Sequence, residues 1–165
     1  MTHRIIVNLT TARQLKQTEI RQLPKPTTVY QKAGLRYERK VRDELKYLCH
    51  LNNASLEYNP WFRFFDFYGA GDCVPDMLIH LPNGMTVIVE VKLTFTNEAI
   101  PKLRDLYAPV VELALNRPAA ILVIARNLTT TAPRPRKSIL NSDITKSPLI
   151  QWLGHGHILW QELQR

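Results

Sequence analysis

Two acidic residues and a lysine are spaced in a way that suits metal-assisted hydrolysis. Asp76 is followed, after thirteen intervening residues, by Glu90, and Lys92 stands two residues further on. Residues two apart on a strand project from the same face, so Glu90 and Lys92 are expected side by side. Two adjacent carboxylates need a cation between them, and a few hard oxygen ligands are typical of Mg²⁺, for which Mn²⁺ can substitute. Such a metal would polarise a phosphoryl oxygen and activate water, while Lys92 orients the water or neutralises developing charge.

The turn before Glu90 decides whether the two carboxylates meet. Pro82-Asn83-Gly84 suits a type I turn followed by a left-handed residue, the three-residue hairpin with a glycine bulge. That turn pairs Leu81 with Met85, and the same register places Asp76 opposite Glu90. A two-residue turn would shift the pairing by one and put the carboxylates on opposite faces.

The neighbouring elements are predicted to complete this site. Residues 34–50 form an amphipathic helix, with a stripe of Leu35, Glu38, Val41, Leu45 and Leu48. Glu38 is therefore a carboxylate on the side that faces the core. Residues 76–81 and 85–93 are predicted strands; in the second, Val87, Val89 and Val91 point to the core face, and the Val91 carbonyl could be a further metal ligand.

The rest of the chain completes an α/β pattern. We expect an aromatic strand buried at least in part on both faces at 58–68, ended by Gly69-Ala70-Gly71. A helix at 100–116, kinked by Pro109, and a buried strand at 119–125 follow. The helix should bury Leu103, Leu106, Tyr107, Val110 and Leu113. A short helix at 148–152 and a strand at 157–163 follow. Residues 1–30 form a basic, poorly packed arm, with a possible edge strand at 5–7 and a short helix at 12–23, and residues 31–165 form one domain. The fold class is α/β with a mixed central sheet flanked by helices.

Charge indicates the partner. The net charge is +8, and residues 1–46 hold eleven Lys and Arg against four Asp and Glu. A polyanion, nucleic acid before membrane, is the natural partner. The expected phosphate contacts are Arg36, Arg39, Lys40, Arg42, Lys102, Arg134, Arg136 and Lys137. Cys49 and Cys73 form no metal-type repeat and are expected to be reduced structural thiols. No apolar run is long enough for a membrane span, so a cytoplasmic location is expected.

These motifs resemble the PD-(D/E)xK nuclease superfamily. Pro75-Asp76 followed by Glu90-Val91-Lys92 matches its signature, and Gly34-Leu35-Arg36-Tyr37-Glu38 is similar to its first-helix glutamate. The resemblance covers residues 34–125, and the layout is similar to that of archaeal Holliday junction resolvases and of phage exonucleases and recombination nucleases. It implies a restriction-endonuclease-like core in which Asp76 and Glu90 bind metal, Glu38 assists and Lys92 is the catalytic lysine. Relatives also carry Gln, Lys or Tyr in the next helix, where Lys102 and Tyr107 stand at a spacing that fits no single subfamily.

Several alternatives remain open at the level of sequence. A junction or branched-DNA endonuclease, acting as a homodimer by analogy with resolvases, is preferred over a phage-type exonuclease. An RNA nuclease and a non-catalytic nucleic-acid-binding protein that keeps the nuclease fold are further readings. Trp61 and Phe62 could stack on bases instead of packing in the core. Asp72 is expected in a turn, and His155 and His157 are expected to be structural.

Overall fold

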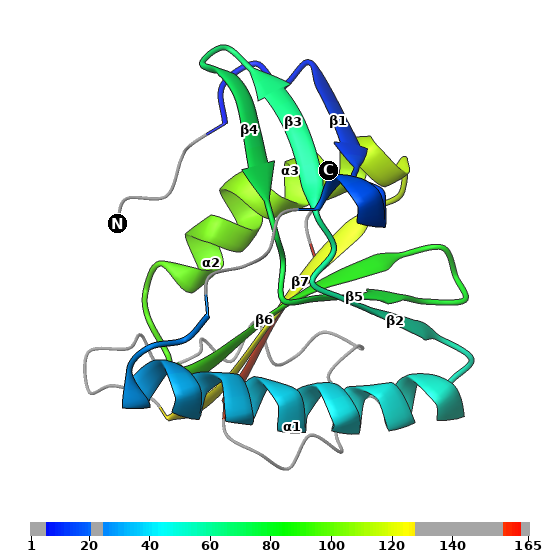
Figure 1. The fold of residues 1–165 in the computed structure, drawn as a ribbon. Coiled ribbons are helices and arrows are strands. Elements are labelled where there is room, and N and C mark those ends of the chain that lie inside the picture. Colours follow the sequence, from blue (N-terminus) through cyan, green and yellow to red (C-terminus); the bar gives the residue numbers. More distant parts are fainter. Residues whose placement is uncertain (1–5, 21–24, 128–156, 163–165) are drawn as a thin grey trace.

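The computed structural model describes residues 6–20 and 25–127 and the strand His157–Glu162. Within this part of the chain, five strands form the larger sheet in the order β2-β5-β6-β7-β8 (Figure 1). Their bounds are Ser55–Tyr58 (β2), Met77–His80 (β5), Thr86–Thr94 (β6), Ala119–Asn127 (β7) and His157–Glu162 (β8). The pair β6–β7 is parallel and the other pairs are antiparallel, so the sheet is mixed as predicted.

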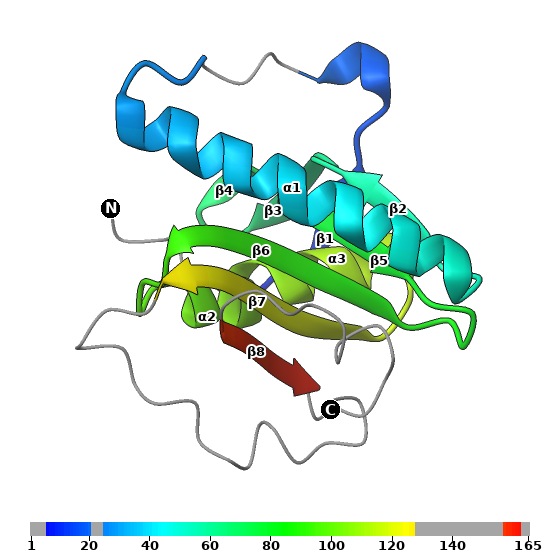
Figure 2. The same cartoon turned by 90° about the horizontal axis from the view of Figure 1, so that it is seen from below.

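Helices cover both faces of this sheet (Figure 2). Helix α1, Val29–Leu51, packs Val41, Leu45 and Leu48 against the face that carries Val87 and Val89. A second helical segment lies on the other face and packs against Ile88 and Ile121. The central strands β6 and β7 are therefore buried on both faces, which explains their nearly continuous run of apolar residues.

Helix α1 confirms the predicted amphipathic helix but begins earlier than its apolar stripe. Thr28 accepts a hydrogen bond from the Gln31 amide at 3.1 Å, and the Gln31 side chain accepts one from the Thr28 amide at 3.1 Å. This reciprocal capping box satisfies two amides that the first turn leaves without helical partners. The helix therefore begins at Val29, ahead of the first predicted residue.

The register predicted for the hairpin of β5 and β6 is confirmed. The Leu81 amide bonds the Met85 carbonyl at 2.9 Å, and the Gly84 amide bonds the Leu81 carbonyl at 3.0 Å. Gly84 has a φ of 87°, the left-handed conformation that the glycine bulge requires. Met77 pairs with Val89, so Asp76, directly before β5, lies level with Glu90.

A second sheet of three strands, in the order β1-β3-β4, was not predicted. Its strands are β1 (Thr11–Gln14), β3 (Phe62–Asp66) and β4 (Gly69–Cys73). The helix predicted at 12–23 is wrong, because β1 pairs with β3 and only a 3₁₀ turn, Gln17–Glu19, follows. Pairing with a distant strand overrides the local helical pattern here. Val7 lies in no strand, although its carbonyl accepts from the Phe67 amide at 2.8 Å.

The aromatic segment 58–68 is two strands in two sheets, not one strand. β2 ends at Tyr58 and β3 begins at Phe62, with Asn59 between them in the left-handed region at a φ of 48°. Burial alternates along β3, so Phe62 and Phe64 are in the core while Phe65 is exposed. On the outer face Arg63 is partly buried and Phe65 is exposed, so the predicted partial burial of both faces fails at Phe65.

The glycines after this segment do not end a strand. Gly69, at a φ of 97°, closes a hairpin and begins β4. The Asp66 carboxylate accepts from the Tyr68 amide at 2.9 Å, a local turn signal that the aromatic residues obscured in the sequence. Asp72 is a β4 residue that pairs with Arg63 at 2.8 Å, so its predicted place in a turn is also wrong.

The second helical segment is irregular where proline predicted a kink. It consists of α2 (Ala99–Lys102), a π-helical segment η2 (Leu103–Tyr107) and α3 (Ala108–Leu115). Pro109 has no amide hydrogen to give a carbonyl of the preceding turn, which favours the wider turn. Leu113 is 46% exposed, so its predicted place in the core is wrong. Among the described helices, none has the length and apolar character that crossing a membrane requires.

Candidate active site

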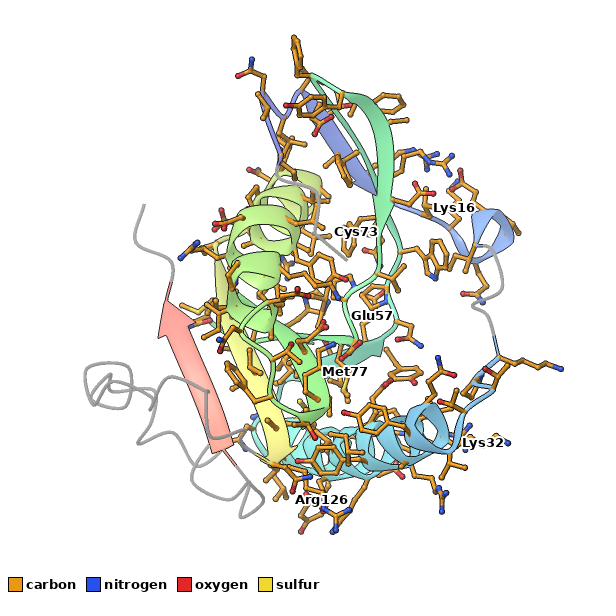
Figure 3. All side chains as sticks on the ribbon, turned by 90° about the vertical axis from the view of Figure 1, so that its left-hand side faces the viewer. Lys16, Lys32, Glu57, Cys73, Met77 and Arg126 are labelled. Atoms are coloured by element: carbon orange, nitrogen blue, oxygen red, sulfur yellow. The ribbon has the colours of Figure 1, made fainter. Side chains whose placement is uncertain are left out.

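The candidate site lies where β5 and β6 separate, just beyond the residue pair Met77–Val89. Asp76 precedes β5, and Glu90 and Lys92 follow the part of β6 that pairs with β5, while they still pair with β7. Lys102 ends α2 and approaches from the helical segment on one face of the sheet. Figure 3 looks toward this region, with Met77, the residue after Asp76, at the start of β5.

Glu90 is the centre of the site. Its residue exposure is 0%, and its Oε1 lies 2.6 Å from Lys92 Nζ and 2.9 Å from Lys102 Nζ. Within the described residues its buried Oε2 has no hydrogen-bond partner. A buried carboxylate is costly unless it is paired and hydrogen-bonded. One Glu90 oxygen is thus held by two cations, and the other has a bonding position to fill.

Asp76 stands next to Glu90 and carries an altered pKa. Its Oδ2 accepts a hydrogen bond from the Val91 amide at 2.7 Å. Burial, followed by the charge of Glu90, raises the pKa of Asp76 to about 8, and Glu38 adds to the effect. The Val91 hydrogen bond and Lys92 oppose the rise without cancelling it. Two carboxylates are therefore held together where both cannot ionise easily unless a cation is added.

The backbone of Val91 adds a further oxygen. In a strand, the amide and the carbonyl of one residue point to the same side, as the paired bonds of an antiparallel ladder require. Since the Val91 amide points to Asp76, its carbonyl points to that side too, where β5 has not yet begun. The buried Val91 side chain lies on the opposite, α1-facing core, as the sequence predicted.

Glu38 approaches from α1 and is held by a residue that the sequence did not single out. The Tyr58 hydroxyl donates to Glu38 Oε1 at 2.7 Å. Burial, then the contact with Glu38, raises the pKa of Tyr58 to about 12, so the phenol remains a donor at neutral pH. Arg42 lies 5.0 Å from the centre of the Tyr58 ring. From the sequence, Tyr58 was predicted to belong to the aromatic core. The signal that could have singled it out is its hydroxyl, because a partly buried phenol usually finds a polar partner.

Lys102 and Tyr107 lie together on the other side of Glu90. Lys102 Nζ is 4.7 Å from the centre of the Tyr107 ring, and the Tyr107 hydroxyl donates to the Val74 carbonyl at 3.1 Å. Burial, with the nearby charge of Glu90, raises the pKa of Tyr107 far above its usual range. The π-helical turn between them brings residues five apart onto one face. Lys102, predicted among the phosphate contacts, thus contacts Glu90 directly.

The other predicted phosphate contacts differ in how accessible they are. Arg36, Arg39 and Lys40 are exposed on α1. Arg42 is less available, because it pairs with Asp43 at 3.1 Å and lies over the Tyr58 ring. The predicted contacts Arg134, Arg136 and Lys137, and also His155, lie outside the described residues.

The donor set fits a hard divalent cation with few protein ligands. No group of three or more His, Cys, Asp or Glu side chains in the described ranges is arranged to hold a metal by itself. Asp76 and Glu90 are brought together, whereas Glu38 is bonded to Tyr58 and acts on Asp76 through its charge. Two carboxylates, one carbonyl and several waters are a common set for Mg²⁺, which keeps part of its hydration shell.

Comparisons of the chain with family sequence models, with curated proteins and with solved structures find no match. The chemistry available to this site therefore has to be inferred from its own residues.

Proposed function

We propose that the chain is a Mg²⁺-dependent DNA nuclease of the PD-(D/E)xK type, built on a restriction-endonuclease-like core. One observation carries the proposal: buried Glu90 keeps one oxygen without a partner among the described residues, beside Asp76, whose pKa is raised to about 8. The charge of Lys92 and the Val91 amide do not cancel the rise in the Asp76 pKa, so this pair still favours an added cation. Mn²⁺ should substitute for Mg²⁺, because both accept the same oxygen ligands.

In this proposal Asp76, Glu90 and the Val91 carbonyl would hold the metal. When bound, the ion would polarise the scissile phosphate and lower the pKa of the attacking water. Lys92 and Lys102 share one Glu90 oxygen at 2.6 and 2.9 Å. Neutralising the carboxylates from the Asp76 side would weaken both ion pairs and free an ammonium for the phosphate or the water. Glu38, fixed by Tyr58, would accept a hydrogen bond from a water in the metal's shell.

The proposed substrate is DNA, preferably branched or junction DNA cut by a homodimer. The net charge of +8 and the exposed Arg36, Arg39 and Lys40 on the helix that carries Glu38 support a polyanion near the site. A phage-type exonuclease uses the same chemistry and differs in how the DNA is presented. Contacts to the backbone would position the substrate without reading its sequence.

A second candidate, a non-catalytic nucleic-acid-binding protein, is favoured by one observation. Lys92 and Lys102 already neutralise Glu90. If these pairs are permanent, the site needs no metal, and the positive surface alone would bind DNA.

The experiment is cleavage of end-labelled linear duplex, single strand, flap and four-way junction, with Mg²⁺, Mn²⁺ or EDTA. Metal-dependent cutting that Asp76→Ala and Lys92→Ala abolish, while DNA binding survives, supports the nuclease. Arg117→Ala, an exposed arginine outside the proposed site, is the matched control. Binding without cutting in every metal would support the second candidate, and preference among the four substrates separates junction endonuclease from exonuclease.

A further inference from the structure

The tip of the β3–β4 hairpin carries aromatic side chains that the fold does not use. Phe67 is 73% exposed and Tyr68 is 66% exposed, and their rings meet edge to face with centroids 5.3 Å apart. Turn positions favour small polar residues, and an exposed aromatic gains nothing from hydrophobic burial. Exposed aromatics of this kind, grouped on one projection, are typical of binding surfaces.

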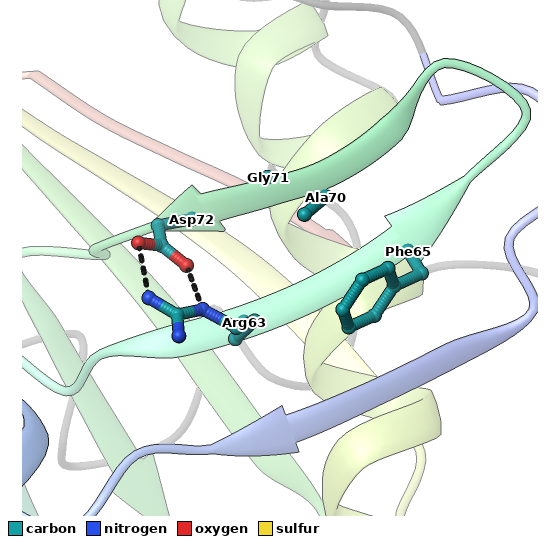
Figure 4. A pocket seen from close by; sticks show the side chains of 5 residues that line it. All are labelled: Arg63, Phe65, Ala70, Gly71 and Asp72. Atoms are coloured by element: carbon teal, nitrogen blue, oxygen red, sulfur yellow. Dashed lines mark hydrogen bonds and ion pairs between the residues drawn. The ribbon is translucent and has the colours of Figure 1, made fainter.

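A third aromatic extends this surface along the outer face of β3. Phe65 is 47% exposed and pairs across the strands with Ala70, whose short side chain leaves the ring uncovered. Phe65 lines a shallow hollow with Ala70 and Gly71, bounded by the ion pair of Arg63 and Asp72 (Figure 4). We name Phe65, Phe67 and Tyr68 the aromatic hairpin surface.

Unpaired bases fit this surface better than a protein does. Its apolar groups are flat rings, and every base offers a flat ring for stacking, whatever the sequence. The outer face also carries Arg13 opposite Arg63, two guanidinium groups in a chain of net charge +8. Each pairs with one carboxylate, Glu19 or Asp72, so its charge is balanced locally, but the two flat guanidinium side chains stay 54% and 34% exposed beside the rings.

The hairpin is also close to the candidate site along the chain. β4 ends at Cys73, and only Val74 and Pro75 separate it from Asp76. The eight peptide steps from Tyr68 to Asp76 span at most about 28 Å. A stacked strand rises about 3.4 Å per nucleotide, so this reach corresponds to about eight nucleotides. The small sheet lies on the far side of the β5 start from α1 (Figure 1), so the hairpin would meet DNA that passes the site.

We propose that the aromatic hairpin surface binds unpaired nucleotides of DNA by stacking, within about eight nucleotides of the bond that the candidate site cuts. This inference rests on the proposed function for its location but not for its chemistry. The alternative that Phe62 stacks on bases is wrong, because Phe62 has 0% exposure and belongs to the core, as the preferred interpretation expected; Trp61 is partly buried.

The test is binding in EDTA, where no metal-dependent cutting occurs. Fluorescence anisotropy of labelled single-stranded DNA, blunt duplex and tailed duplex is compared between wild type and Phe67→Ala/Tyr68→Ala. Loss of stacking should weaken single-strand and tailed-duplex binding about 5- to 150-fold for each base released. Blunt-duplex affinity should stay within about twofold, since it depends on phosphate contacts. Tyr47→Ala, which removes an aromatic that is 56% exposed on α1, is the control and should change neither.

The outcomes separate this inference from the proposed function. Equal loss on blunt duplex, or no loss on single strands, overturns the stacking surface even if the protein cuts DNA. A selective loss in a protein that never cuts supports the surface and rejects the nuclease. An unchanged affinity together with an altered sedimentation coefficient assigns the hairpin to protein contact instead. A fluorescent purine analogue placed at successive distances from the cut would locate the stacked base.

Discussion

The two lysines on Glu90 make a prediction about stability that does not depend on catalysis. Replacing both by methionine, Lys92→Met/Lys102→Met, leaves a carboxylate whose side chain is 1% exposed without its cations. Removing one partner of a buried ion pair costs about 3–5 kcal/mol. The lysines are themselves 32% and 30% exposed, so part of their attraction is already screened. We therefore expect a loss of about 3 kcal/mol for the double variant.

The single variants should lose much less, because the remaining lysine still holds the same oxygen. We expect about 1 kcal/mol for each, so the two losses should not add. Urea denaturation at neutral pH in EDTA, followed by circular dichroism, measures these differences. For a domain of this size, about 3 kcal/mol should lower Tm by roughly 6–12 °C.

Glu90→Gln in the double-methionine background is the matched control. A neutral amide needs no counter-charge, so it should restore most of the lost free energy of unfolding. Strict additivity of the single losses, or failure of Glu90→Gln to restore stability, would show that the lysines do not act through Glu90.

Three further predictions concern the candidate site and the two buried thiols. The pKa of Asp76 is raised from 3.8 to about 8, so the folded state binds more protons than the unfolded state between these values. Stability in EDTA should therefore fall as pH rises from about 4 to 8, and urea melts of Asp76→Asn should show a flatter profile. Tyr58→Phe removes the hydroxyl that donates to Glu38 at 2.7 Å. The Mn²⁺ concentration needed for half-maximal cleavage should then rise a few-fold, with Tm nearly unchanged. An unchanged Mn²⁺ requirement would show that Tyr58 does not position Glu38 for metal binding. Burial raises the pKa values of Cys49 and Cys73 to about 11 and 12. Iodoacetamide should therefore label both thiols slowly in the native protein and quickly in urea. Fast labelling of the native protein would contradict this burial.

The sequence predicted the centre of the fold well because local chemistry specifies it. Pro82-Asn83-Gly84 admits few turn geometries, and the observed register follows from the glycine bulge. The apolar stripe of α1 and the unbroken apolar run of β7 are also strong local signals. The pairing of Asp76 with Glu90 could be inferred for this reason.

The features that were missed depend on contacts between distant segments. β1 forms a strand because β3 offers it a partner, about fifty residues away, and its own residues carry no strong strand pattern. The split between β2 and β3 depends on Asn59 in a left-handed conformation, which an aromatic-rich segment conceals. Contacts of Lys102 with Glu90 and of Tyr58 with Glu38 cross between elements and leave no periodic trace in the sequence.

The central claim, that Asp76 and Glu90 hold a divalent cation, is tested most directly by titrating Mn²⁺ and measuring the free ion by electron paramagnetic resonance. Wild type should bind Mn²⁺, with Mg²⁺ competing, and Asp76→Asn and Glu90→Gln should each abolish or strongly weaken this binding. Arg117→Ala should bind as wild type does. Absence of Mn²⁺ binding in wild type, or binding by both carboxylate variants that is as tight as in wild type, would contradict the account.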